Sequence, residues 1–249
     1  MRALRAMTWV ELKLFAREPV TVLFLLVLPL VILYVLNGVF GSQPDPTVWE
    51  GQPPVDFYTP SYVALTAATA GILSLPVHLA GYREQGVLRR FRASAIRPAT
   101  LIGAHMVVAG ALATAGALLL TVVSWIGYDV ALPEDWLGVL LAYLVVILAF
   151  TALGGLLGLA MPTARAAQGL GVLLFFVFMM LGGAGPPKEA LPTSLQHVAD
   201  VVPVTHAGAM LRHPWLYSDW DVGATAVMLL ILVGSVALTA WRLRHEEAR

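Results

Sequence analysis

The stretch LGVLLAYLVVILAFTALGGLLGLAM, residues 137–161, decides the fold class of this chain. It contains no Asp, Glu, Lys or Arg, and it exceeds the ~20 apolar residues that a helix needs to cross a bilayer. Inside lipid every backbone N–H and C=O must be bonded within the segment, which a helix achieves. Residues 137–161 therefore predict a transmembrane helix, in which Gly154 and Gly158 form a G-x-x-x-G that favours close helix contact.

Working outward from this stretch, five further segments lack Asp, Glu, Lys and Arg and are long enough to span a bilayer: residues 20–40, 61–82, 99–127, 166–185 and 223–241. Only 12% of the whole chain is charged, whereas soluble domains have roughly 25% charged residues. A barrel strand would alternate apolar and polar residues over ~10 positions, which these segments do not. The sequence thus predicts an all-α integral membrane protein with six transmembrane helices, and Pro29 and Pro76 are expected to kink two of them.

The basic residues fix the expected orientation of these helices. Thirteen of the fifteen Lys and Arg residues lie in segments 1–19, 83–98, 162–165 and 242–249. The other two, Lys188 and Arg212, lie in segment 186–222, and the remaining connections have none. Because cytoplasmic loops are enriched in Lys and Arg, this alternation places both termini in the cytoplasm.

Residues 2–18 have the pattern of an amphipathic helix at the membrane interface. Basic residues gather on one face of the helical wheel and apolar residues on the other, but Glu11 and Glu18 fall within the apolar face. A carboxylate against lipid is costly unless it is paired. This face is therefore expected to contact protein, with arginines of segment 83–98 as partners; the alternative is an irregular helix whose glutamates reach water.

Segment 83–98 combines five arginines with an apolar set that includes Leu88 and Phe91. One interpretation is anchoring beside the membrane, with lipid headgroups as partners. The other is a short cytoplasmic helix that docks on a soluble protein, where arginines bond carboxylates in pairs. Docking is favoured because anchoring alone does not require apolar side chains between the charges.

The chain lacks the residues that several other functions need. The six apolar stretches contain no Asp, Glu, Lys or Arg, which argues against an ion-coupled carrier, and His78 and His105 fit packed or interfacial histidines better than a proton relay. Cysteine is absent, and no zinc-protease, serine-hydrolase or P-loop motif occurs. No catalytic or metal-binding residue is expected in this chain.

Short motifs along the chain occur in a recognisable order. They are Arg17-Glu18-Pro19, Leu28-Pro29, Arg83-Glu84-x-Gly86, Arg97-Pro98, Leu191-Pro192 and Val202-Pro203. This order resembles the membrane (permease) subunit of type-2 ABC exporters, the ABC-2 family of bacterial antibiotic, lipid and polysaccharide export.

The resemblance implies one ABC-2 type transmembrane domain over residues 1–249. Residues 1–19 would form a connecting helix with Glu11, Arg17 and Glu18, and 186–222 would form external re-entrant helices before the sixth span. Segment 83–98 would carry the coupling helix, with Arg83, Glu84, Gly86, Leu88, Arg89, Arg90, Phe91, Arg92 and Arg97 as residues that couple to the ATPase.

The resemblance also implies the partners. A separate ABC ATPase in two copies would hold ATP and Mg²⁺, so no cofactor is expected in this chain. A second copy of the chain, or a related permease, would complete the pathway in a bacterial plasma (inner) membrane among its lipids; no nucleic acid is expected to bind. The transported substrate would be hydrophobic or amphipathic: a drug, a lipid or a glycan. The alternatives are a secondary carrier or channel, a membrane-embedded enzyme of lipid metabolism, and a scaffold that only recruits an ATPase.

Overall fold

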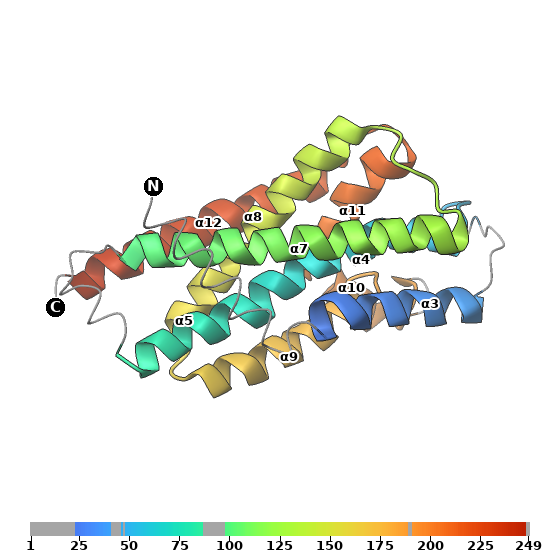
Figure 1. Ribbon diagram of the computed structural model, residues 1–249. Helices are drawn as coiled ribbons and strands as arrows, with labels where there is room; N and C mark the ends of the chain where they lie inside the picture. Colours follow the sequence, from blue (N-terminus) through green and yellow to red (C-terminus); the bar gives the residue numbers. More distant parts are fainter. Residues whose placement is uncertain (1–22, 41–45, 47, 87–97, 189–190, 248–249) are drawn as a thin grey trace.

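The fold is seen in a computed structural model that describes residues 23–40, 46, 48–86, 98–188 and 191–247. These residues form helices and no strand (Figure 1). In chain order the elements are η1 (Leu23–Val27), α3 (Leu28–Phe40), α4 (Pro54–Thr69), η2 (Ala70–Ser74), α5 (Leu75–Glu84), α7 (Pro98–Tyr128), α8 (Trp136–Ala160), α9 (Ala164–Leu181), α10 (Thr193–Ala199), α11 (Pro203–Leu216) and α12 (Val222–Glu247).

Five helices are long and apolar enough to cross a membrane: Pro54–Glu84, Ile102–Tyr128, Trp136–Ala160, Ala164–Leu181 and Val222–Arg242. They coincide with five of the six predicted stretches. The first predicted stretch, 20–40, contains η1 and α3, a shorter apolar helix within the described residues. The all-helical membrane fold is therefore confirmed, whereas the first of the six predicted spans, 20–40, stays a prediction.

The second predicted stretch was drawn too short at its N-terminal end. The helix begins at Pro54 rather than at residue 61, and it contains Asp56 in its first turn. A carboxylate is accommodated there because the N-terminal end of a helix favours negative charge, and because Asp56 Oδ1 accepts a hydrogen bond from the Ala131 N–H at 2.9 Å. Selecting segments without charged residues removed this turn from the prediction.

The continuous rod α4–η2–α5 is the core of the bundle. Every residue of α4 and η2 is buried, including the large side chains of Tyr58 and Tyr62. Helices α7, α8, α9 and α11 pack around this rod, and α12 lies against α8 and α11 (Figure 1). The outer faces of α7, α8 and α12 expose Leu, Val, Ile and Trp side chains, as expected where protein meets lipid.

Both predicted proline kinks coincide with a widened turn. Pro29 follows the π-helical turn η1, and Pro76 follows the π-helical turn η2. A helical proline lacks an N–H, and its ring clashes with the carbonyl four residues earlier. Those residues are Leu25 and Ile72, which lie within η1 and η2, so the π-turns give room for the two rings.

Helix α8 passes very close to η2 and α5. A Cβ atom built on Gly154 would lie 1.9 Å from the carbonyl oxygen of Gly71, and one on Gly158 would lie 2.8 Å from the Leu79 Cβ. Only glycine allows the two backbones to approach this closely. The G-x-x-x-G of the sequence therefore does mark a helix contact.

At the end of the bundle opposite α5, two short elements join α9 to α12. Helix α10 is largely at the surface, with Val201 just beyond it 79% exposed. Helix α11 packs against α4 and buries Leu211 and Trp215. Whether these two elements are the expected external re-entrant helices stays a prediction.

Candidate functional site

Helix α5 ends in a glycine turn at the start of the predicted coupling segment. The Gln85 N–H donates to the Gly81 carbonyl at 3.0 Å, and the Gly86 N–H donates to the Arg83 carbonyl at 3.1 Å. Gly86 has φ +68°, in the left-handed region that favours glycine as the residue ending a helix. The chain therefore leaves α5 in a defined direction toward residue 87.

The Arg83 side chain reaches the C-terminal end of α8. Its Nη1 donates to the carbonyl oxygen of Leu159, and it lies 3.4 Å from the carbonyl oxygen of Met161. The last carbonyls of a helix have no partner within that helix, and they form the negative end of its dipole. The guanidinium of Arg83 donates hydrogen bonds to these carbonyls and places a positive charge at the negative end of the dipole, so it caps α8.

The next residue, Glu84, reaches the N-terminal end of α9. Its Oε2 accepts a hydrogen bond from the Ala164 N–H at 3.1 Å. Thr163 is the N-cap of α9, and its Oγ1 accepts from the Ala166 N–H at 3.1 Å. A carboxylate is favoured here because the N-terminal end of a helix dipole is positive.

Two consecutive residues of opposite charge thus bond the two sides of one short turn. We call this arrangement the clasp: Arg83 and Glu84 of α5 together with the α8–α9 turn, residues 159–164. Figure 1 shows that the end of α5 and the α8–α9 turn lie at the same end of the bundle, on the left. Gly81 supports the contact, because its Cβ position is 3.6 Å from the Ala164 Cβ.

The structure describes three of the residues predicted to couple to an ATPase, namely Arg83, Glu84 and Gly86. Arg83 and Glu84 turn toward the chain's own helices, which the charge pattern of segment 83–98 did not indicate. One sequence feature bears on this contact. The connection 162–165 between two predicted spans is very short, so the ends of these two spans must lie close together. Nine predicted site residues lie outside the described residues: Glu11, Arg17, Glu18, Leu88, Arg89, Arg90, Phe91, Arg92 and Arg97.

The two histidines of the predicted spans pack against aromatic neighbours. The rings of His78 and His105 have centroids 5.5 Å apart, and the Tyr82 ring meets His105 edge-on at 5.3 Å. The Nδ1 of His78 lies 2.9 Å from the Ser74 carbonyl oxygen. This arrangement agrees with packed histidines.

A polar cluster that the sequence did not predict lies at the opposite end of the bundle. The Arg212 guanidinium of α11 stacks 3.7 Å from the ring centroid of Phe57, with Nη2 3.4 Å from Ser61 Oγ and Nη1 3.5 Å from Glu50 Oε1. The Tyr217 hydroxyl donates to Glu50 Oε2 at 2.8 Å. Burial, with the Glu50 carboxylate, raises the pKa of Tyr217 to about 12.

Comparison with known proteins identifies the group that shares this chain's pattern. The family model described as ABC-2 type transporter matches residues 2–216. The chain belongs to the ABC-2 type transporter family. The resemblance drawn from the short motifs is thereby confirmed.

Two relatives of this ABC-2 protein are permeases by name. "Putative transport permease YvfS" of Bacillus subtilis (strain 168) is 26% identical over 211 residues, covering 84% of each chain. "Daunorubicin resistance ABC transporter permease protein DrrB1" of Streptomyces coeruleorubidus is 25% identical over 243 residues, covering 93% of this chain and 81% of DrrB1. The chain is accordingly a multi-pass membrane protein and the permease subunit of an ABC exporter, a transport subunit.

Proposed function

We propose that this permease is driven by a separate ABC ATPase, whose two copies bind ATP and Mg²⁺ and dock on segment 83–98 beside the 1–19 helix. The permease lies in a bacterial plasma membrane with both termini in the cytoplasm, and it works with a second copy of itself or a related permease. The charges of the described residues support this orientation. The end of α5, the start of α9 and the end of α12 lie at one end of the bundle, whereas α11 lies toward the other (Figure 1). The first three carry Arg83, Arg165, Arg242 and Arg244, and α11 carries Arg212.

The clasp is the observation that carries this proposal. Arg83 and Glu84, at the start of the docking segment, bond the ends of α8 and α9. A shift of the docked segment therefore moves the α8–α9 turn together with the end of α5. Helix α5 continues through η2 into α4, so the same shift reaches the buried rod at the centre of the bundle.

Asp56 is a carboxylate within a span, but its hydrogen bond fits a structural role better than ion coupling, which disfavours a carrier driven by an ion gradient. This carboxylate lies within the span Pro54–Glu84, where a coupling site for protons or sodium would be expected. Its Oδ1 accepts from the Ala131 N–H at 2.9 Å, which ties the start of α4 to the connection between α7 and α8. The position and bonding of Asp56 thus fit a structural role.

Docking is tested by co-purification of the permease with its ATPase after co-expression. Reversing three charges together, with Arg89, Arg90 and Arg92 each changed to Glu, should abolish co-purification. Arg165→Glu, a reversal at the same end of the bundle outside the segment, serves as the matched control and should leave co-purification intact. Equal recovery of the ATPase with the triple variant and the control would show that segment 83–98 is not the docking element.

A further inference from the structure

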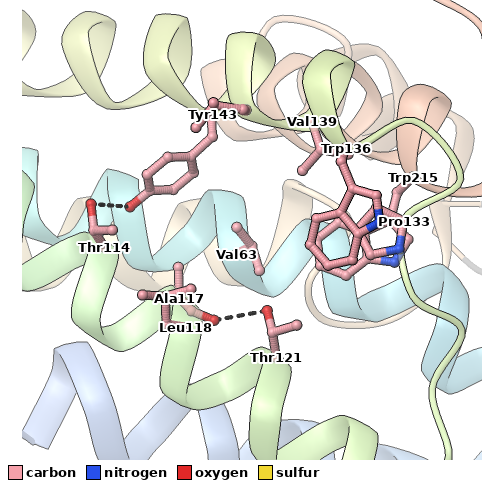
Figure 2. Close-up of a pocket in the computed structure, with 11 residues that line it drawn as sticks. Val63, Thr114, Ala117, Leu118, Thr121, Pro133, Trp136, Val139, Tyr143 and Trp215 are labelled. Carbon is pink, nitrogen blue, oxygen red and sulfur yellow. Dashed lines mark hydrogen bonds between the residues drawn. The ribbon is translucent and has the colours of Figure 1, made fainter.

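A groove about 190 Å³ in volume opens between α7 and α8, away from the clasp (Figure 2). Ala117 and Leu118 of α7 form one wall, and Trp136 and Leu140 of α8 form the other. Val63 of α4 and Trp215 of α11 also line the groove. We call this feature the α7–α8 groove.

The floor of the groove is fixed by bonds to the connection between α7 and α8. Ala131 in this connection is held at both backbone groups: its N–H donates to Asp56 Oδ1 at 2.9 Å, and its carbonyl accepts from Trp215 Nε1 at 2.9 Å. The Glu134 N–H donates to the Trp215 carbonyl at 3.1 Å. Trp215 is only 3% exposed, so its indole ring is a rigid part of the floor.

The polar side chains of the lining are directed into internal bonds. The Thr121 hydroxyl donates to the Ala117 carbonyl at 2.9 Å, and the Tyr143 hydroxyl donates to Thr114 Oγ1 at 3.3 Å (Figure 2). The Thr114 hydroxyl in turn donates to the Gly110 carbonyl at 2.8 Å. Because these donors are already used and the rest of the lining is mainly apolar, the groove fits an apolar ligand.

The groove opens on the lipid-facing side of two membrane spans. Leu118, Leu140 and Trp136 on its rim are 62%, 54% and 61% exposed. Trp136 begins its span, where aromatic side chains favour the level of the lipid headgroups. Tyr143 lies seven residues further along α8, or about 10 Å deeper at 1.5 Å per residue. The groove therefore descends from the interface into the hydrocarbon.

We propose that the α7–α8 groove binds one acyl chain of a phospholipid, in the leaflet at the α11 end of the bundle. The groove is larger than the ~150 Å³ apolar cavity that accepts benzene, and its open side lets a longer chain continue into the bilayer. The bound chain takes the place of helix contacts at the start of α8, which stands apart from α7 (Figure 1). Further along α8 the two helices are close, because a Cβ on Gly110 would lie 3.7 Å from Ile147.

The first test uses nanodiscs that contain a phospholipid with a photoreactive diazirine in its acyl chain. Ala117→Phe fills the groove from its wall, whereas Leu119→Phe places the same ring on the lipid-facing side of α7, where Leu119 is 42% exposed. Labelling of the α8 peptide that contains Leu140 and Tyr143 should fall severalfold in Ala117→Phe and stay at the wild-type level in Leu119→Phe. Equal labelling in all three proteins would overturn the proposal.

The second test measures contact with Trp215 directly. The emission of Trp215 is the difference between wild type and Trp215→Phe, and phospholipids brominated on the acyl chain should quench it. Trp215 lines the groove, so a brominated chain bound there lies against its ring, and absence of quenching contradicts the proposal. Because the chain has no cysteine, Leu118→Cys also reports a competing occupant: a disulfide between two copies would show that a second permease, not lipid, covers the groove.

Discussion

Replacing Gly154 by alanine should destabilise the bundle, because the new methyl group has no room at the crossing of α8 and η2. The added Cβ would lie 1.9 Å from the Gly71 carbonyl oxygen and 2.7 Å from its carbonyl carbon. Carbon–oxygen contacts of this kind normally lie at about 3.3 Å, so the two helices must separate by more than ~1 Å. Overpacking of this type costs ~1–3 kcal/mol, which for a chain of this size corresponds to a fall in Tm of about 2–12 °C.

The matched control is Gly234→Ala in α12, where an added Cβ would meet nothing within 4 Å. Alanine is favoured over glycine in a helix by up to ~1 kcal/mol, so the Tm of this variant should be unchanged or slightly higher. Thermal unfolding of the detergent-solubilised permease, followed by size-exclusion chromatography with fluorescence detection, measures both variants. If Gly154→Ala were as stable as Gly234→Ala, the close helix crossing would be refuted.

Three further predictions concern the α11 end of the bundle. The pKa of Tyr217 is raised to about 12 from 10 by burial and by the Glu50 carboxylate; stability from the neutral phenol is therefore complete below pH 10 and lost as pH rises through about 12. In Tyr217→Phe this loss should disappear from the unfolding midpoints recorded across that range. Asp56→Ala leaves the Ala131 N–H without its acceptor and should cost ~1–3 kcal/mol, whereas Asp56→Asn keeps an acceptor oxygen and should unfold close to wild type. Arg212→Lys keeps the charge but loses the planar stacking on a phenyl ring, so thermal unfolding should show a loss of about 0.5–2 kcal/mol.

The membrane spans could be predicted because lipid imposes a rule that the sequence must obey locally. Residues 137–161 were expected to form a helix, and α8 runs from Trp136 to Ala160. The rule fails where a charged side chain within a span is hydrogen-bonded to a residue far away in the sequence. Asp56 is the example, because its Oδ1 accepts from the Ala131 N–H, seventy-five residues later. Span existence is thus readable from the sequence, whereas span ends depend on tertiary contacts.

The clasp could not be predicted, because its contacts join residues about eighty positions apart. The sequence marked Arg83 and Glu84 as part of a basic segment and of a family motif, and both properties pointed toward an external partner. Their actual neighbours are the Leu159 carbonyl and the Ala164 N–H, which are backbone groups. A backbone partner leaves no trace in the residue pattern, so only the folded arrangement of α5, α8 and α9 identifies it.

The stacking of Arg212 escaped the sequence for a related reason. Arg212 was counted only as one of two basic residues in segment 186–222, and nothing near it in the chain indicates Phe57. The contact follows from the packing of α11 on α4, which buries most of the arginine side chain. The prolines were predicted in part. Pro76 indicated a kink from the sequence, but only the structure shows the π-turn that relieves the clash of its ring.

The turnover of the partner ATPase, measured with and without this permease in nanodiscs, tests most directly whether the clasp transmits motion between the two. We expect the wild-type permease to change the ATPase rate. Glu84→Ala should still co-purify with the ATPase but lose most of that change, because it removes the oxygen that accepts from the Ala164 N–H at 3.1 Å. A charge-assisted hydrogen bond contributes ~1.5–3 kcal/mol, enough to alter coupling about tenfold. An ATPase that never assembles with the permease, or a Glu84→Ala assembly with the wild-type rate, would contradict coupling through the clasp.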